Sequence, residues 1–168
     1  MRLFFALWPP AKTAHALSQW THGVHKDTGG SLTATEKIHL TLAFLGEADP
    51  DRAHNAAQRV QGGRHALPLD QARYWKHNKI VWVGPTAMPP PLGALVGQLH
   101  SALRDQGFAL EDRPFAAHIT LLRKARPPHS LPPLPPLEWP VGEFLLVRSR
   151  TSPKGSTYEP MERFALAG

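Results

Sequence analysis

Two stretches of the chain alternate apolar and polar residues in nearly the same way. The first is IHLTLAFL at residues 38–45, followed by Gly46, and the second is AHITLLRK at residues 117–124. Successive side chains of a β-strand point to opposite faces, so each stretch predicts a strand with one buried apolar face. The predicted core face consists of Ile38, Leu40, Leu42 and Phe44 in the first strand and of Ala117, Ile119 and Leu121 in the second.

The opposite face of each predicted strand carries a histidine followed two positions later by a threonine. His39 and Thr41 share this face in the first strand, and His118 and Thr120 share it in the second. A lone histidine in a strand is more often an ordinary hydrogen-bonded residue than a catalytic one. The repetition at the same offset, in matching apolar surroundings, favours one catalytic element used twice.

The remaining pattern predicts an α+β chain in the order β-α-β-α-β-β-α-β-loop-β-β. Asp49 is the expected N-cap of the second helix, because Pro50 suits a first turn and a cap carboxylate accepts from a first-turn amide. Each motif strand follows a strand and a helix, which suggests an internal duplication. The further strands are predicted at 2–8, 66–74, 79–84, 143–150 and 157–166. The helices are predicted at 12–25, from 49 to the glycines at 62–63, and at 89–106.

The segment from Pro127 to Pro140 consists mostly of proline and leucine. This composition favours an extended, polyproline-like conformation over a helix or a central strand. We expect a surface connection here, and a ligand for a proline-binding domain is the less favoured alternative.

Composition and charge narrow the class of protein. The chain of 168 residues is long enough to bury a core and predicts one domain, 1–168, of two similar lobes. The absence of cysteine excludes disulfides, thiolate nucleophiles and cysteine-ligated metals. A formal net charge of +6 favours a polyanionic partner such as RNA or a nucleotide, although a merely basic soluble surface explains it equally well.

The N-terminal apolar run stops at Pro9. It is therefore too short for a signal peptide, and a membrane-spanning helix needs about 20 apolar residues. We expect a cytoplasmic, monomeric protein without membrane association.

Two histidines on facing strands suit acid–base chemistry at phosphorus. Near pH 7 one imidazole can accept a proton from water while the other donates a proton to the departing oxygen. The threonine hydroxyls can donate hydrogen bonds to the phosphate oxygens. A catalytic metal is the less favoured alternative, since each motif supplies only one strong ligand and no His-Glu-x-x-His occurs.

The two motifs, together with RLFFAL at residues 2–7 and the RPF that precedes HITLLR, resemble the paired HxTx signatures of the 2H phosphoesterase superfamily. Within it, the chain is similar over nearly its whole length to the bacterial family of RNA 2′,3′-cyclic phosphodiesterases, also described as 2′-5′ RNA ligases. The resemblance implies an α+β, bilobal duplicated fold, with two antiparallel sheets lining a central cleft and helices on the outer faces. It also implies hydrolysis of RNA 2′,3′-cyclic phosphate ends to a 2′-phosphomonoester, with no cofactor.

The resemblance also implies roles for single residues. His39 would protonate the leaving 3′-oxygen and His118 would activate water, while Thr41 and Thr120 would hold the phosphate. Arg123 matches the basic residue after the second motif. Strand alternation puts it on the face opposite His118, so it reaches the cleft only if the strand ends or bulges before it.

Two weaker candidates for RNA contacts are Arg113 and Trp75, because aromatic faces stack on single-stranded bases. Trp82 and Phe44 are expected to pack in the sheet and the core. The alternatives to cyclic phosphate hydrolysis are 2′-5′ ligation, 2′-5′ phosphodiester cleavage, and a non-catalytic RNA- or nucleotide-binding module. The intact histidine and threonine pairs argue against the last.

Overall fold

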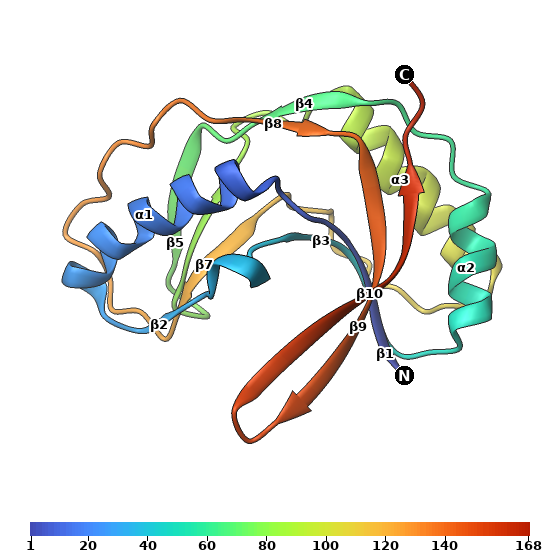
Figure 1. Cartoon of the computed structure of the whole chain (residues 1–168), viewed down its shortest axis with the longest axis horizontal. Coiled ribbons are helices and arrows are strands. Elements are labelled where there is room, and N and C mark those ends of the chain that lie inside the picture. Colours follow the sequence, from blue (N-terminus) through green and yellow to red (C-terminus); the bar gives the residue numbers. More distant parts are fainter.

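A computed structural model describes all residues, 1–168, and confirms the α+β class. Three α-helices accompany a large antiparallel sheet and a small two-stranded sheet (Figure 1). The helices are α1 (Ala11–Thr28), α2 (Pro50–Gln58) and α3 (Pro90–Asp105), with a 3-10 turn, η1, at Thr35–Lys37. The strands are β1 (Arg2–Leu7), β2 (Ser31–Leu32), β3 (Leu40–Glu47), β4 (His65–Pro68), β5 (Gln71–Trp75), β6 (Ile80–Gly84), β7 (Ile119–Arg123), β8 (Glu138–Val141), β9 (Glu143–Ser152) and β10 (Gly155–Ala165).

The large sheet consists of two halves that meet at β3 and β7. Its strand order is β10-β9-β1-β3-β7-β6-β5, with β2 paired to β7. Between β3 and β7, only Leu40 and Ile119 are in register. The two sheets expected from the resemblance are thus the halves of one sheet, joined by a single residue pair.

Helices α1 and α3 each pack against the half of the sheet that does not contain the strand before them. Helix α1 follows β1 but packs against β2, β7 and η1, whereas α2 and α3 pack against each other on the opposite side of the molecule (Figure 1). His100 of α3 forms a 2.8 Å hydrogen bond with the Leu42 carbonyl of β3, which ties α3 to the first half. The units β1-α1-β3 and β6-α3-β7 therefore have the same arrangement. In each, two antiparallel strands pair with each other, and the helix between them packs against the other half of the sheet.

The helix predictions and the β5–β6 hairpin are confirmed, and Asp49 caps α2 by accepting a 3.0 Å hydrogen bond from the Asp51 amide. The predicted strand at 66–74 is divided into β4 and β5. Strand β4 pairs with β8, at the end of the proline-rich segment, and this pairing could not be read from either stretch alone. No helix has the length and apolar character needed to cross a bilayer.

The prediction that Phe44 lies in the core is wrong, because one of the two bulges in β3, at Leu42, lies between Thr41 and Phe44. The register with β1 skips Leu42 and Leu45, so Phe44 pairs with Phe4 and its side chain is 72% exposed. A bulge inserts one residue and reverses the alternation that follows it. Gly46, next to one bulge, has a φ of 66°, a left-handed conformation that glycine adopts without a steric penalty.

Candidate active site

The two histidine motifs meet where the halves of the sheet are joined. His39 directly precedes Leu40 and His118 directly precedes Ile119, the one pair that links β3 to β7. In an antiparallel register, the residue before one partner lies beside the residue after the other. His39 is thereby brought toward Thr120, and Thr41 toward His118.

His39 is enclosed by aromatic rings from β1, from the residue directly after it and from β10. The Trp8 indole stacks on the imidazole with a centroid distance of 4.7 Å and an interplanar angle of 11°. The rings of Phe4 and Tyr158 lie at 5.3 Å and 5.2 Å. Trp8 is itself fixed by a 3.0 Å hydrogen bond from its Nε1 to the Glu36 carbonyl in η1.

Hydrogen bonds set the tautomer of His39. Its Nδ1 lies 2.7 Å from the Lys37 carbonyl oxygen and its Nε2 lies 3.1 Å from Oγ1 of Thr41. A carbonyl only accepts, so Nδ1 carries the hydrogen and Nε2 of the neutral ring presents a lone pair. The Nε2 of His39 is thus the atom available for proton transfer.

Burial lowers the pKa of His39 below the usual histidine value, because the charged imidazolium loses hydration among these rings. The hydrogen bond to the Lys37 carbonyl opposes this effect, whereas the positive charges of Arg123 and His118 lower the pKa further. Burial among these rings therefore favours the neutral form of His39 in the free protein. Arg123 and His118 both lie close enough to influence the charge state of His39.

His118 has a similar backbone bond but a different aromatic neighbourhood. Its Nδ1 lies 2.8 Å from the Ala116 carbonyl, which again leaves Nε2 for chemistry. Trp75 of the β5–β6 hairpin lies 4.7 Å away, ring to ring, and Trp82 lies at 6.2 Å. Trp75 is thus beside His118, and Trp82, which pairs with Thr120, is buried on the same face of the sheet.

A bulge in β7 brings Arg123 to the histidine face. Thr120 pairs with Trp82 and Leu122 pairs with Val81, so the register skips Leu121. Trp82 and Val81 are neighbours on β6, so they point to opposite faces of the sheet. Leu122 therefore points to the face away from Thr120, and Arg123 points to the same face as Thr120. The strand therefore bulges before Arg123, as the side chain of Arg123 requires in order to reach the cleft.

Arg113 is not gathered into this cluster by any contact. Its side chain is exposed and forms two hydrogen bonds with the Glu111 carboxylate, at 2.7 Å and 3.1 Å. Its charge is therefore largely matched by a neighbour two residues away. A role for Arg113 with RNA stays a prediction.

Sequence reasoning missed Trp8, Phe4 and Tyr158 as the residues that enclose His39. Trp8 and Phe4 alternate with the buried residues Leu3, Phe5 and Leu7 along the first predicted strand, so period-two analysis of that strand could have placed them on the histidine face. Tyr158 gave no comparable local signal. Its position depends on the pairing of β10 with β9 and of β9 with β1.

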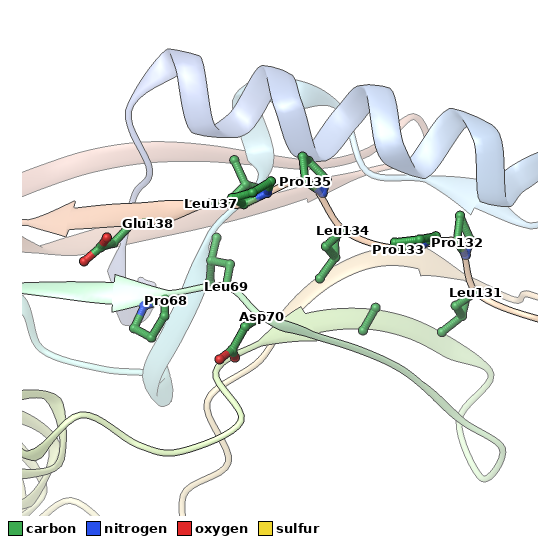
Figure 2. A pocket seen from close by; sticks show the side chains of 12 residues that line it. Pro68, Leu69, Asp70, Leu131, Pro132, Pro133, Leu134, Pro135, Leu137 and Glu138 are labelled. Carbon is green, nitrogen blue, oxygen red and sulfur yellow. The ribbon is translucent and has the colours of Figure 1, made fainter.

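Neither His39 nor His118 lines the two cavities described next. One, of about 710 Å³, is bounded by the proline-rich segment and the link between β4 and β5 (Figure 2). Its carboxylates come from Asp70 and Glu138, and Asp70 already accepts hydrogen bonds from Thr86. The other, of about 580 Å³, adjoins Trp8. Histidine, aspartate and glutamate side chains nowhere gather in a group of three or more that could hold a metal ion.

The paired histidine–threonine motifs thus lie where the two halves of the antiparallel sheet meet. The profile of the family described as LigT like Phosphoesterase matches the chain twice, over residues 7–82 and 83–158. The chain belongs to this family.

Full-length relatives agree with this membership. The chain is 36% identical to the RNA 2′,3′-cyclic phosphodiesterase of Escherichia coli, covering 98% of this chain and 96% of the relative. It is 34% identical to the enzyme of the same name from Thermus thermophilus, covering 100% and 91%. The crystal structure of E. coli LigT complexed with 3′-AMP superposes with a TM-score of 0.92 at 33% identity, covering 99% of this chain and 98% of that one.

Proposed function

We propose that this protein hydrolyses RNA 2′,3′-cyclic phosphate ends to 2′-phosphomonoesters. The observation that carries the proposal is the meeting of His39, Thr41, His118 and Thr120 at the single pair that joins β3 to β7. Relatives named RNA 2′,3′-cyclic phosphodiesterase and a relative crystallised with 3′-AMP support the choice of substrate.

In the proposed reaction, Nε2 of His118 accepts a proton from water as the water oxygen attacks phosphorus. The bond between phosphorus and the 3′-oxygen breaks, and Nε2 of His39 donates a proton to that oxygen. The ribose keeps the phosphate on its 2′-oxygen. Each such proton transfer contributes roughly 10²- to 10⁴-fold to the rate.

Thr41, Thr120 and Arg123 stabilise the phosphate in this scheme. Their hydroxyl and guanidinium groups donate hydrogen bonds to the non-bridging oxygens, whose negative charge increases in the transition state. Trp75, beside His118, offers a face for the base of the terminal nucleotide.

The donor role of His39 requires a change in its charge state. Burial favours the neutral ring in the free protein, so the ring must gain a proton when the anionic phosphate enters and offsets the lost hydration. The reverse assignment, with His39 as base, fits the free protein directly and corresponds to cleavage of a 2′-5′ linkage, in which the 3′-hydroxyl attacks phosphorus and the 5′-oxygen leaves. The pH dependence of kcat/KM separates the two assignments.

Joining or cleaving 2′-5′ phosphodiesters is the second candidate function, since it needs the same two imidazoles. A non-catalytic binding module is disfavoured because all four motif side chains are present. We further propose that residues 1–168 form one duplicated domain, in line with the two successive matches to the family profile. An RNA partner, a monomeric state and a cytoplasmic location stay predictions.

The test is turnover of a 2′,3′-cyclic nucleotide by the purified protein in the presence of EDTA. We expect ring opening to continue at an unchanged rate, because no step requires a metal. Complete loss of activity on chelation, restored by a divalent cation, would contradict the metal-free mechanism.

A further inference from the structure

The outer part of the β9–β10 hairpin extends beyond the rest of the large sheet. The pairing of β9 with β1 ends at Ser149, whereas the pairing of β9 with β10 continues to Ser152, which lies opposite Gly155. We call residues 150–157 the β-ribbon, which projects from the body of the molecule in the lower part of Figure 1. No third strand pairs with the β-ribbon.

The β-ribbon adds nothing to the hydrophobic core. None of its side chains is buried, and all except Ser156 are exposed. An isolated two-stranded hairpin is only marginally stable in water, so burial of apolar surface does not account for this projection. A binding role accounts for it, because connecting segments that a rigid scaffold holds out at the surface commonly carry function.

Positive charge is concentrated in this part of the chain. The sequence RSRTSPKGST at residues 148–157 contains Arg148, Arg150 and Lys154 and neither aspartate nor glutamate. Among these cations only Arg150 has an ion-pair partner, Glu159 at 3.5 Å. Both side chains of that pair are more than half exposed, so water and salt weaken it. A polyanion is therefore the complementary partner.

One face of the β-ribbon continues the histidine face of the sheet. Phe4, whose ring lies 5.3 Å from that of His39, is in register with Val147 of β9. Residues opposite each other in an antiparallel pair share a face, and side chains alternate along each strand. The face of Phe4 therefore carries four residues with hydroxyl groups, Ser149, Thr151, Ser156 and Tyr158.

This row of hydroxyl groups starts at the proposed active site. The Tyr158 ring lies 5.2 Å from the imidazole of His39, and the three residues from Tyr158 back to the start of β10 span about 10 Å when extended. In the β-ribbon, the hydroxyls of Ser152 and Thr157 bind backbone carbonyls, whereas those on the histidine face have no partner in the protein. The free hydroxyls can bind phosphate oxygens and ribose 2′-hydroxyls. An RNA that ends in a cyclic phosphate continues only on its 5′ side, so an RNA held at His39 reaches the β-ribbon with nucleotides that precede its end.

We propose that the β-ribbon binds the sugar–phosphate backbone of RNA on the 5′ side of the cyclic phosphate end. Lys154 binds a phosphate, and Thr151 and Ser156 bind phosphate oxygens or ribose hydroxyls. The proposal rests on the proposed function, to which it adds that the substrate is the end of a longer RNA chain. An acidic protein surface would be attracted by the same charges, but it would leave the free hydroxyls and their continuity with the histidine face without a role.

The test compares the binding of a nucleoside 3′-phosphate with that of an octanucleotide RNA ending in a 3′-phosphate, neither of which has a cyclic bond to open. In a shortened variant, Asn-Gly replaces residues 151–156 and forms a two-residue turn between Arg150 and Thr157, which removes no buried side chain. We expect about tenfold weaker binding of the octanucleotide and unchanged binding of the nucleoside phosphate, because only the longer ligand reaches the β-ribbon. Lys154→Glu in the intact hairpin should also weaken binding of the octanucleotide. It should reduce the slope of log affinity against log salt concentration by about 0.7, the value for one phosphate contact on a single strand.

Arg104→Glu is the matched control for Lys154→Glu, since Arg104 is also exposed and without an ion-pair partner but lies on α3. It should bind both ligands as the wild type does. Equal weakening of both ligands in the shortened variant, or weakening of neither, would overturn the assignment. Polyglutamate is the probe for an acidic protein surface. If it binds the wild type as tightly as the octanucleotide does, and loses as much affinity in the shortened variant, the assignment to RNA is wrong.

The same variants separate this proposal from the proposed function. An octanucleotide that binds through the β-ribbon, while the 2′,3′-cyclic form of the same RNA stays intact, would refute the hydrolysis alone. Equal kcat/KM for a cyclic mononucleotide and for an octanucleotide with a cyclic end, in both the wild type and the shortened variant, would refute the role of the β-ribbon alone.

Discussion

The two histidines have the same backbone hydrogen bond but different surroundings. Each donates from Nδ1 to the carbonyl two residues earlier, at 2.7 Å for His39 and 2.8 Å for His118. His39 is stacked under Trp8 and bound to Thr41, whereas Trp75 is tilted by 58° against His118. A duplicated motif thus supplies two equivalent imidazoles, and the rings contributed by other strands make them chemically unequal.

The largest effect is expected from removing either histidine. His39→Ala and His118→Ala should each lower kcat for a 2′,3′-cyclic nucleotide by roughly 10²- to 10⁴-fold, because each loses one proton transfer. Steady-state kinetics and binding of a nucleoside phosphate provide the measurement, and binding should be largely kept.

His65→Ala is the matched control for both variants. His65 also donates from Nδ1 to a carbonyl two residues earlier, the Gly63 oxygen at 2.9 Å, but it lies in β4, away from the cleft. Its removal should leave kcat intact. Undiminished turnover in either motif variant would remove that histidine from the mechanism.

The threonines test whether the two halves hold the phosphate equally. Thr41→Val and Thr120→Val should each lower kcat/KM by roughly 10- to 100-fold, the range for one hydrogen bond to a charged group. Only Thr41 is bonded to its histidine, at 3.1 Å. Thr41→Val should therefore also change the pH–rate profile, and an identical shift in Thr120→Val would contradict the inequality of the two halves.

Trp8 tests the cause of the low pKa of His39. Burial disfavours the imidazolium, so Trp8→Ala should rehydrate the ring and raise the pKa of His39 toward the usual histidine value. The NMR titration of the His39 ring protons measures this change, with Trp75→Ala as the control that leaves it in place. An unchanged midpoint in Trp8→Ala would mean that the stacked indole does not desolvate the ring.

The pH dependence of kcat/KM decides the roles. If His39 is the donor in the free protein, kcat/KM should fall as the pH rises through its lowered pKa, and if His39 is the base, kcat/KM should fall as the pH drops through that value. Trp8→Ala should move that same limb upward. A profile that is flat between pH 5 and 8, with chemistry rate-limiting, would contradict acid–base catalysis by the pair.

The smallest effect concerns stability. Because the pKa of His39 is lowered by folding, the unfolded chain binds more protons between the folded pKa and about 6.5. The His39 contribution to the free energy of unfolding is complete above that range and decreases as the pH falls through it. In urea titrations, the free energy of unfolding should decrease less steeply with falling pH in His39→Gln than in the wild type. The same slope in both proteins would contradict the lowered pKa of His39.

The sequence predicted the features that depend on one stretch alone. The three helices, the Asp49 cap and the faces of His39, Thr41, His118 and Thr120 follow from local spacing and capping chemistry. Alternation also predicted the burial of Ala117, Ile119 and Leu121, but not that of Leu122, which the bulge in β7 turns to the core.

The features that it did not predict depend on partners distant in the sequence. The bulges that expose Phe44 and redirect Arg123 arise from the register with β1 and β6, which no single strand determines. The same holds for the pairing of β4 with β8 and for the position of Tyr158 against His39. The different surroundings of the two histidines were missed for this reason, since those of His39 come from Phe4 of β1, Trp8 directly after it and Tyr158 of β10.

The central claim is tested most directly by identifying the product of a 2′,3′-cyclic nucleotide opened by the wild-type protein in EDTA. Phosphorus NMR distinguishes the 2′-phosphate from the 3′-phosphate. We predict the 2′-phosphate alone, because the proton from His39 reaches the departing 3′-oxygen. A 3′-phosphate, a mixture of the two, or an intact cyclic ring would contradict the account.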